Sequence, residues 1–157
     1  MGQRFMHPVF VSTDSLPYMD GSIVLIEDQP YDAELTLRAL RGLGVDEQVT
    51  HVRDGAEALT YLLDENDPES PPPKLILLDL KLPKVSGIEV LEALKSDERT
   101  KCIPVIALSS SQEQQDVERC YALGVNSYVV KPVDFTDFTN TVQQIGRYWI
   151  SMNQTVC

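Results

Sequence analysis

The sequence predicts an α/β fold in which a parallel sheet lies between two layers of helices. The order of the segments along the chain supports this prediction. Short apolar segments typical of strands alternate five times with amphipathic segments typical of helices. A helix between two such strands makes a right-handed crossover, so this alternation places helices on both faces of one open sheet. The 157 residues fit a single domain with its own core.

Five segments are predicted as strands because they are short, apolar and bounded by polar or turn residues. In chain order they are residues 22–27, 48–54, 75–78, 103–108 and 126–130. The third and fourth are apolar throughout, which is typical of strands buried on both faces. The second alternates apolar and polar residues, and we expect a shorter strand there.

Five segments are predicted as helices because their apolar residues recur every three or four positions. In chain order they are residues 31–43, 55–63, 87–96, 112–123 and 133–152. Residues 64–73 combine acids with prolines, which predicts a long exposed loop. Residues 1–21 lack periodicity and are predicted as a tail, so the folded domain should span 22–150, with a second tail at 151–157.

The net charge, the hydropathy and the cysteines limit which partners and which compartment we expect. The net charge of -11 should repel nucleic acid and anionic lipid, so we expect no binding to either. No segment reaches the roughly 18 apolar residues of a membrane span, and we expect a cytoplasmic protein. The chain has three cysteines, Cys102, Cys120 and Cys157, and no two of them form a C-x-x-C pair. An odd number of cysteines without such a pair predicts neither a disulfide framework nor a zinc site.

Polar residues at the carboxyl ends of the strands predict the functional site. The fold expected is flavodoxin-like and doubly wound, with strand order 2-1-3-4-5, and such sheets bind ligands at this edge. The residues there are Glu27 and Asp28 after the first strand, Asp79 after the third, Ser109 ending the fourth and Lys131 after the fifth. Clustered carboxylates raise each other's pKa unless a cation lies among them, and an all-oxygen site suits Mg²⁺.

With Mg²⁺ bound, one carboxylate can attack a phosphoryl group while other groups share the charge on its oxygens. Asp79 fits the nucleophile, and Lys131 and Ser109 fit the groups that contact the phosphoryl oxygens.

These residues resemble the receiver domain of two-component response regulators, the CheY-like family. The resemblance covers residues 22–150 and rests on the acidic pair at 27–28, D-x-x-x-P at 79–83, Gly87, Ser109, Tyr128 and the Lys131-Pro132 pair. It implies that Asp79 accepts a phosphoryl group from the phosphohistidine of a sensor histidine kinase. It also implies that Mg²⁺ is held by Glu27, Asp28, Asp79 and the backbone carbonyl of Lys81.

The resemblance assigns further roles. Lys131 would contact a phosphoryl oxygen, and Ser109 and Tyr128 would form a switch that alters the surface of residues 112–152. The Lys131–Pro132 peptide would be cis. Ser109 replaces a more usual threonine but keeps the hydroxyl, and Lys81 places a cation where it could exclude or orient the hydrolytic water. Such a protein is a phosphoacceptor that catalyses its own phosphoryl transfer and dephosphorylation, and is not an enzyme acting on other substrates.

Finer features resemble the stand-alone regulators that partner bacterial and cyanobacterial phytochrome kinases. They are the 64–73 loop, SSS at 109–111, YALGVNSYVVKPVD at 121–134 and IGRYW at 145–149. Only SMNQTVC follows the last helix, so we expect the output to be protein binding. We expect a homodimer through the fourth helix, fifth strand, fifth helix and C-terminal segment. The reason is that the fifth helix carries more apolar residues than one buried stripe needs, namely Val142, Ile145, Trp149 and Ile150.

Each site residue taken alone also has a simpler interpretation. Asp28 could cap the first helix, with Asp32 favouring its dipole, and Ser109 or Ser111 could cap the fourth. Asp79 and Lys131 could be solvated charges, and Tyr128 could only pack at the sheet edge. His7 and His51 are expected to pack or face solvent, and Trp149 to cover the core edge or an interface.

Three other functions are alternatives to the receiver. A flavodoxin-type electron carrier needs a Ser/Thr/Gly-rich phosphate cradle after the first strand, where EDQP stands instead. Aspartyl phosphatases resemble D-x-D, whereas this chain has Asp79-Leu80-Lys81. A receiver-like docking module that is not phosphorylated remains the alternative.

Overall fold

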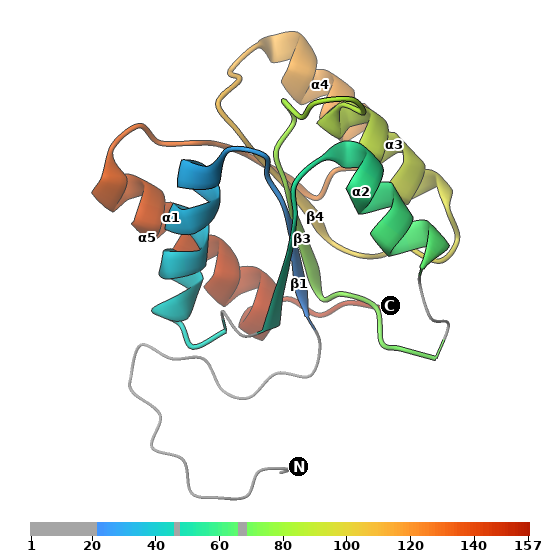
Figure 1. The fold of residues 1–157 in the computed structure, drawn as a ribbon, viewed down its shortest axis with the longest axis horizontal. Helices are drawn as coiled ribbons and strands as arrows, with labels where there is room; N and C mark the ends of the chain where they lie inside the picture. Colours follow the sequence, from blue (N-terminus) through green and yellow to red (C-terminus); the bar gives the residue numbers. More distant parts are fainter. Residues whose placement is uncertain (1–21, 46–47, 66–68) are drawn as a thin grey trace, which may run out of the picture.

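The protein is described by a computed structural model that covers residues 22–45, 48–65 and 69–157 (Figure 1). The predicted tail at 1–21, with His7, and residues 66–68 of the predicted loop lie outside the described residues. Within the described part of the chain, no helix is both long and apolar enough to cross a membrane.

Across the described residues, five parallel strands form one sheet in the order β2-β1-β3-β4-β5, which confirms the predicted fold class. The strands are β1 (Ile23–Ile26), β2 (Val49–Val52), β3 (Leu75–Leu78), β4 (Val105–Ser109) and β5 (Ser127–Val130). β1, β3 and β4 are buried at every position, as expected of central strands covered on both faces. Ile26 pairs with Leu78, so Glu27 and Asp79 leave the sheet side by side at its carboxyl edge.

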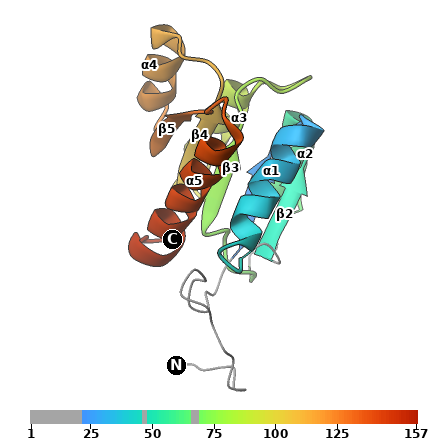
Figure 2. The ribbon, with the colours of Figure 1, turned by 90° about the vertical axis from the view of Figure 1, so that its left-hand side faces the viewer.

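Helices cover both faces of the sheet (Figures 1 and 2). They are α1 (Pro30–Arg41), α2 (Gly55–Leu59), α3 (Gly87–Ser96), α4 (Gln114–Ala122) and α5 (Phe135–Gly146). α3 has the predicted bounds, whereas α4 begins two residues later than predicted. The predicted second and fifth helices each end in a π-helical segment, η2 (Thr60–Asp64) after α2 and η3 (Arg147–Met152) after α5.

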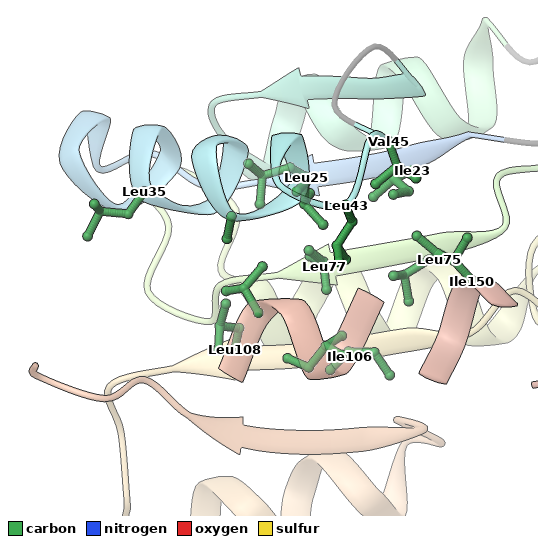
Figure 3. Packing of buried hydrophobic residues seen from close by; sticks show 14 of the residues in the cluster. Ile23, Leu25, Leu35, Leu43, Val45, Leu75, Leu77, Ile106, Leu108 and Ile150 are labelled. Carbon is green, nitrogen blue, oxygen red and sulfur yellow. The ribbon is translucent and has the colours of Figure 1, made fainter. Parts of the chain in front are cut away.

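Two apolar clusters fill the space between the sheet and its helices. One joins the sheet to α1 and α5 (Figure 3). The other joins the opposite face to α2, α3 and α4. The strand residues alternate between the two clusters, so that Leu77 belongs to the first and Leu78 to the second. This two-sided burial fixes the sheet edge from which Asp79 projects.

The structure corrects the prediction that helix 5 has surplus apolar residues for a partner. Val142, Ile145 and Ile150 are all buried within the chain, and Trp149 is half-buried against the same cluster. The physical reason is that α5 packs on the sheet and on α1 together, so its apolar surface is wider than one stripe. At Gly146, a Cβ would lie only 2.8 Å from Leu43 Cδ1, which shows how closely α5 approaches the segment that follows α1 on the same face of the sheet.

The structure also corrects the prediction that the cysteines form no disulfide. Cys102, in the connection between α3 and β4, is bonded to Cys157 in the segment after η3, with the two Cα atoms 5.6 Å apart. The two residues are 55 positions apart, and the return of the chain along α5 brings them together, which their spacing alone does not reveal. Cys120 is a free, buried thiol in α4.

The expected cis peptide before Pro132 is not found. The described residues contain no cis peptide bond, so Lys131–Pro132 is trans. Trans is the lower-energy isomer of an X-Pro bond by about 0.5–1 kcal/mol.

Candidate functional site

Three carboxylates converge at the carboxyl edge of β1 and β3. The backbone hydrogen bonds of the sheet continue past the strand ends, from Asp79 N to the Ile26 carbonyl (3.0 Å) and from Glu27 N to the Val52 carbonyl (3.1 Å). These bonds fix the backbone of both residues. One oxygen each of Glu27, Asp28 and Asp79 lies within 4.8 Å of the others. Glu27 is 2% exposed and Asp79 6%, so Asp79 is not a solvated strand-end acid.

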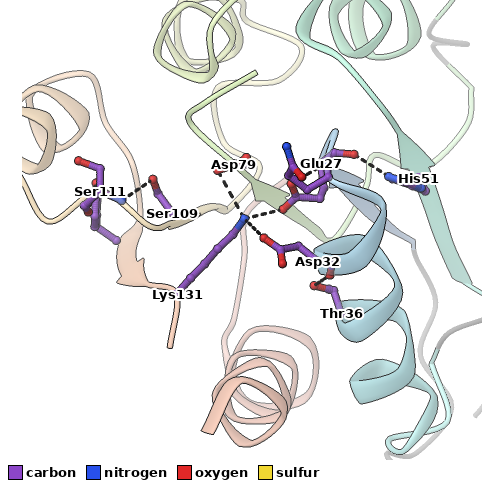
Figure 4. Close-up of polar contacts among 10 residues, drawn as sticks. Glu27, Asp32, Thr36, His51, Asp79, Ser109, Ser111 and Lys131 are labelled. Atoms are coloured by element: carbon purple, nitrogen blue, oxygen red, sulfur yellow. Dashed lines mark hydrogen bonds and ion pairs between the residues drawn. The ribbon is translucent and has the colours of Figure 1, made fainter. Parts of the chain in front are cut away.

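Lys131 places an ammonium group among these carboxylates. Its backbone N–H donates to the Ser109 carbonyl (2.8 Å), which continues the pairing of β5 with β4. Its Nζ lies 2.9 Å from Glu27 Oε1, 2.8 Å from Asp32 Oδ2 and 3.7 Å from Asp79 Oδ1 (Figure 4). The side chain is only 9% exposed, so Lys131 is a buried counter-ion and not a surface charge.

Burial sets the protonation behaviour of the cluster. It raises the pKa of Glu27 to about 7, and the negative charge of Asp79 adds to the effect, although Lys131 opposes it. Burial also raises the pKa of Asp79, against the pull of Lys131. For Lys131, burial lowers the pKa, but the ion pairs with Asp32 and Glu27 outweigh it and the net shift is upward.

The raised pKa of Glu27 makes the stability of the folded state depend on pH. A carboxyl whose pKa is raised by folding favours the folded state when protonated, and this contribution is lost as pH rises through the folded pKa. For Glu27 the loss falls between pH about 4.5 and about 7. At neutral pH the cluster therefore carries negative charge at a cost in stability, which a cation would offset.

The donor set fits a divalent metal ion. Asp28 Oδ1 is buried yet has no hydrogen-bond partner among the described residues. Buried polar atoms are nearly always paired, so this oxygen is available to bind a metal ion. Glu27 and Asp79 add carboxylate oxygens, and hard divalent cations prefer all-oxygen sites. Asp28 does not cap α1, since the N-cap position is Gln29 and no side-chain bond is made there.

The segment after Asp79 lies close to the cluster. The Lys81 backbone N–H bonds to the Asp79 carboxylate and lowers the pKa of Asp79, while the Lys81 side chain is exposed. At Gly87, the first residue of α3, a Cβ would overlap the Asp79 carbonyl oxygen, so only glycine permits this approach. Ser86 and Glu89 close a reciprocal capping box at the start of the same helix.

Ser109 and Tyr128 are linked through Ser111. Ser109 is fully buried and its Oγ accepts from the Ser111 N–H (3.1 Å), while Tyr128 Oη donates to the Ser111 carbonyl (2.8 Å). Ser111 Oγ in turn donates to Asp116 Oδ2 in the first turn of α4 (2.6 Å). The half-buried Tyr128 ring packs against the cluster on the α2–α4 face, and burial raises its pKa. The fifth strand, the β4–α4 connection and α4 thus share one hydrogen-bond chain.

Sequence reasoning missed two contacts of the site. The sequence indicates for Asp32 only a favourable charge near the dipole of α1, yet Asp32 binds Lys131, 99 residues away. The available signal was its place in the first turn of the helix that starts at the same sheet edge as Lys131. His51, on β2, donates from Nε2 to the Glu27 carbonyl (2.8 Å), which ties the neighbouring strand to the cluster.

Comparison with known proteins identifies the family. The response regulator receiver domain matches residues 23–143. The chain belongs to this family. The chain is similar to the probable methanogenesis regulatory protein FilR2 of Methanothrix harundinacea, 41% identical over 85% of this chain and 86% of that protein. Response regulator Rcp1 of Synechocystis is 39% identical over 82% of this chain and 88% of its own.

Solved structures agree with this assignment. The phosphorylated cyanobacterial phytochrome response regulator RcpA superposes with a TM-score of 0.81 at 39% identity, over 87% of this chain and 99% of its own. The Mn²⁺-bound form of Rcp1 gives a TM-score of 0.80 at 35% identity, over 88% of this chain and 100% of its own. The predicted similarity to phytochrome response regulators is confirmed. A metal-bound relative agrees with the donor set found here.

Proposed function

We propose that this chain is a single-domain response regulator whose receiver domain, residues 22–150, accepts a phosphoryl group on Asp79 from a sensor histidine kinase. The observation that carries the proposal is the cluster of three carboxylates, Glu27, Asp28 and Asp79, with the Lys131 ammonium beside two of them, 2.9 Å from Glu27 Oε1 and 3.7 Å from Asp79 Oδ1. Phosphorylation then changes which proteins the chain binds.

The reaction follows from the chemistry of these groups. A carboxylate oxygen of Asp79 attacks the phosphorus of a phosphohistidine, the new P–O bond forms and the P–N bond breaks. The bond's electron pair stays on the imidazole nitrogen, which takes a proton from solvent. The Lys131 ammonium balances charge on one phosphoryl oxygen, and the Ser109 hydroxyl donates to another. Hydrolysis of the aspartyl phosphate by water restores the carboxylate and ends the signal.

Mg²⁺ is the ion we propose for Glu27, Asp28, Asp79 and the Lys81 carbonyl. When bound it would neutralise the charge of the phosphoryl oxygens. We expect Mg²⁺ to shift the backbone amide resonances after β1 and β3. Asp28→Asn should weaken binding roughly tenfold, since ligand charge sets the affinity of such sites. Glu34→Gln, on the exposed face of α1, is the control. No response of the wild type at millimolar Mg²⁺ would refute the site.

The kinase partner we propose is a phytochrome. Support comes from RcpA, a phytochrome response regulator with the same fold at 39% identity. FilR2, at comparable identity, is described as a methanogenesis regulator, so identity alone does not select the kinase.

Phosphotransfer to the purified chain from a phytochrome histidine kinase and from an unrelated histidine kinase tests the proposal. The modified residue is then mapped by mass spectrometry. We expect faster labelling by the phytochrome kinase, with the phosphoryl group on Asp79. No labelling by any kinase would favour the non-phosphorylated docking module, and labelling elsewhere would refute the acceptor.

We also propose a symmetric homodimer through α4, β5, α5 and the C-terminal segment. The support is a set of exposed apolar side chains on these elements and on η3, which are Tyr121, Val130, Phe135, Tyr148, Met152 and Val156. Phosphorylation should shift the dimer population through the different affinities of the two states. Sedimentation at micromolar concentration, with and without beryllofluoride, measures this. A monomer in both conditions would exclude the dimer, and an unchanged dimer would exclude only the switching.

A further inference from the structure

The Lys131 ammonium makes its two short contacts with residues other than the phosphoacceptor. The Nζ–Oδ2 distance to Asp32 is 2.8 Å and the Nζ–Oε1 distance to Glu27 is 2.9 Å, both within hydrogen-bond range. The distance to Asp79 Oδ1 is 3.7 Å, which is an ion pair without a hydrogen bond. Figure 4 shows the Lys131 side chain with its Nζ between Asp32 on α1 and Asp79 after β3.

Asp32 is held in place by its own helix. It lies in the first turn of α1, which begins with Pro30, and a carboxylate is favoured near a helix N-terminus. Thr36 Oγ1 donates to the Asp32 carbonyl (2.8 Å) one turn later. The Asp32 side chain is 29% exposed, and Asp32 is not one of the three clustered metal-site carboxylates. Its carboxylate therefore contacts the site through Lys131.

We propose that Asp32 is a positioning residue that holds Lys131 back from Asp79 until a phosphoryl group competes for the ammonium. This inference rests on the proposed function, because it concerns regulation of the same site. A phosphoryl group on Asp79 offers Lys131 new anionic oxygens, and Lys131 reaches them by giving up or lengthening its bond to Asp32. The strength of the Asp32–Lys131 bond therefore determines how much of the favourable free energy between Lys131 and the phosphoryl group is offset when Lys131 moves.

A positioning role of Asp32 and a merely structural role predict different effects on beryllofluoride binding. Asp32→Asn removes the single negative charge that competes for Lys131 and that also repels the phosphoryl group. We expect it to lower the beryllofluoride concentration at half saturation, measured with Mg²⁺ present, by roughly tenfold, the size of one charge-assisted hydrogen bond. Loss of a simple structural contact would instead leave binding unchanged or weaken it.

Two matched variants complete the experiment. Glu34→Gln removes a charge from the same helix, where Glu34 pairs with Arg38 on the surface, and should leave binding unchanged. Asp32→Glu restores the charge and should bring binding back toward the wild type. The NMR resonances of the Lys131 side chain give a second readout. In Asp32→Asn without beryllofluoride, we expect them to lie closer to their positions in the wild-type adduct.

The outcomes separate this inference from the function on which it rests. If the wild type binds beryllofluoride at Asp79 but Asp32→Asn binds it equally or more weakly, the positioning role is wrong and the phosphoacceptor stands. If Glu34→Gln tightens binding as much as Asp32→Asn, the effect is one of net charge and the inference fails. If the wild type shows no beryllofluoride binding, the proposed function falls, and this inference with it.

Discussion

Asp79→Asn is expected to abolish phosphoryl acceptance while leaving the fold intact. The amide is nearly isosteric with the carboxylate but is a poor nucleophile. Without metal at pH 8, the variant should also be at least as stable as the wild type, because one buried negative charge is gone. The pKa of Glu27 should fall toward its ordinary value, since Asp79 is one cause of its elevation. Phosphotransfer with mass analysis measures the acceptance, thermal unfolding measures the stability, and an NMR titration measures the pKa of Glu27.

Lys131→Ala is the informative companion to this variant. It leaves the nucleophile in place, so we expect some phosphorylation to remain while much of the conformational response at Tyr128 and α4 is lost. Full labelling of Asp79→Asn, in excess of a reaction without kinase, would show that the acceptor lies elsewhere.

Reduction of the Cys102–Cys157 disulfide is expected to lower the free energy of unfolding by about 4 kcal/mol. The value follows from the loop-closure entropy that a bridge removes from the unfolded chain when it spans 55 positions. Urea unfolding of the air-oxidised protein, with and without a dithiol reductant, gives the difference.

Cys157→Ser provides the control for this measurement. The variant should match the reduced wild type, and the reductant should change its stability no further. Cys120 is a buried free thiol in either state, so it does not complicate the comparison. Equal midpoints for oxidised and reduced wild type would contradict the prediction.

The sequence was sufficient to predict the cluster at the sheet edge. The apolar run before Asp79 indicates a central strand, and parallel topology brings the ends of β1, β3, β4 and β5 to one edge. Glu27, Asp28, Asp79 and Lys131 could therefore be grouped before their distances were known. Their protonation could be foreseen only as a tendency, because it depends on burial.

The contacts that could not be predicted are those made between distant segments. Asp32 meets Lys131 because α1 and the end of β5 converge, and an acid in a first helical turn has a sufficient local explanation. Ile150 is a surplus apolar residue on an isolated helix, but in the structure it lies on η3 and is buried in the cluster that joins the sheet to α1 and α5. The Cys102–Cys157 bond likewise depends on where the chain returns after η3.

The disulfide places one group of the site residues inside a covalently closed ring and leaves the others outside it. Residues 102–157 form a closed ring that contains β4, α4, β5 and α5, and with them Ser109, Tyr128 and Lys131. The three clustered carboxylates lie outside that ring. The bonds from Lys131 to Glu27 and Asp32 therefore join a cyclic segment to a linear one. In the oxidised protein any displacement of Lys131 is a deformation of this closed loop, whereas in the reduced protein the same residues belong to an open chain.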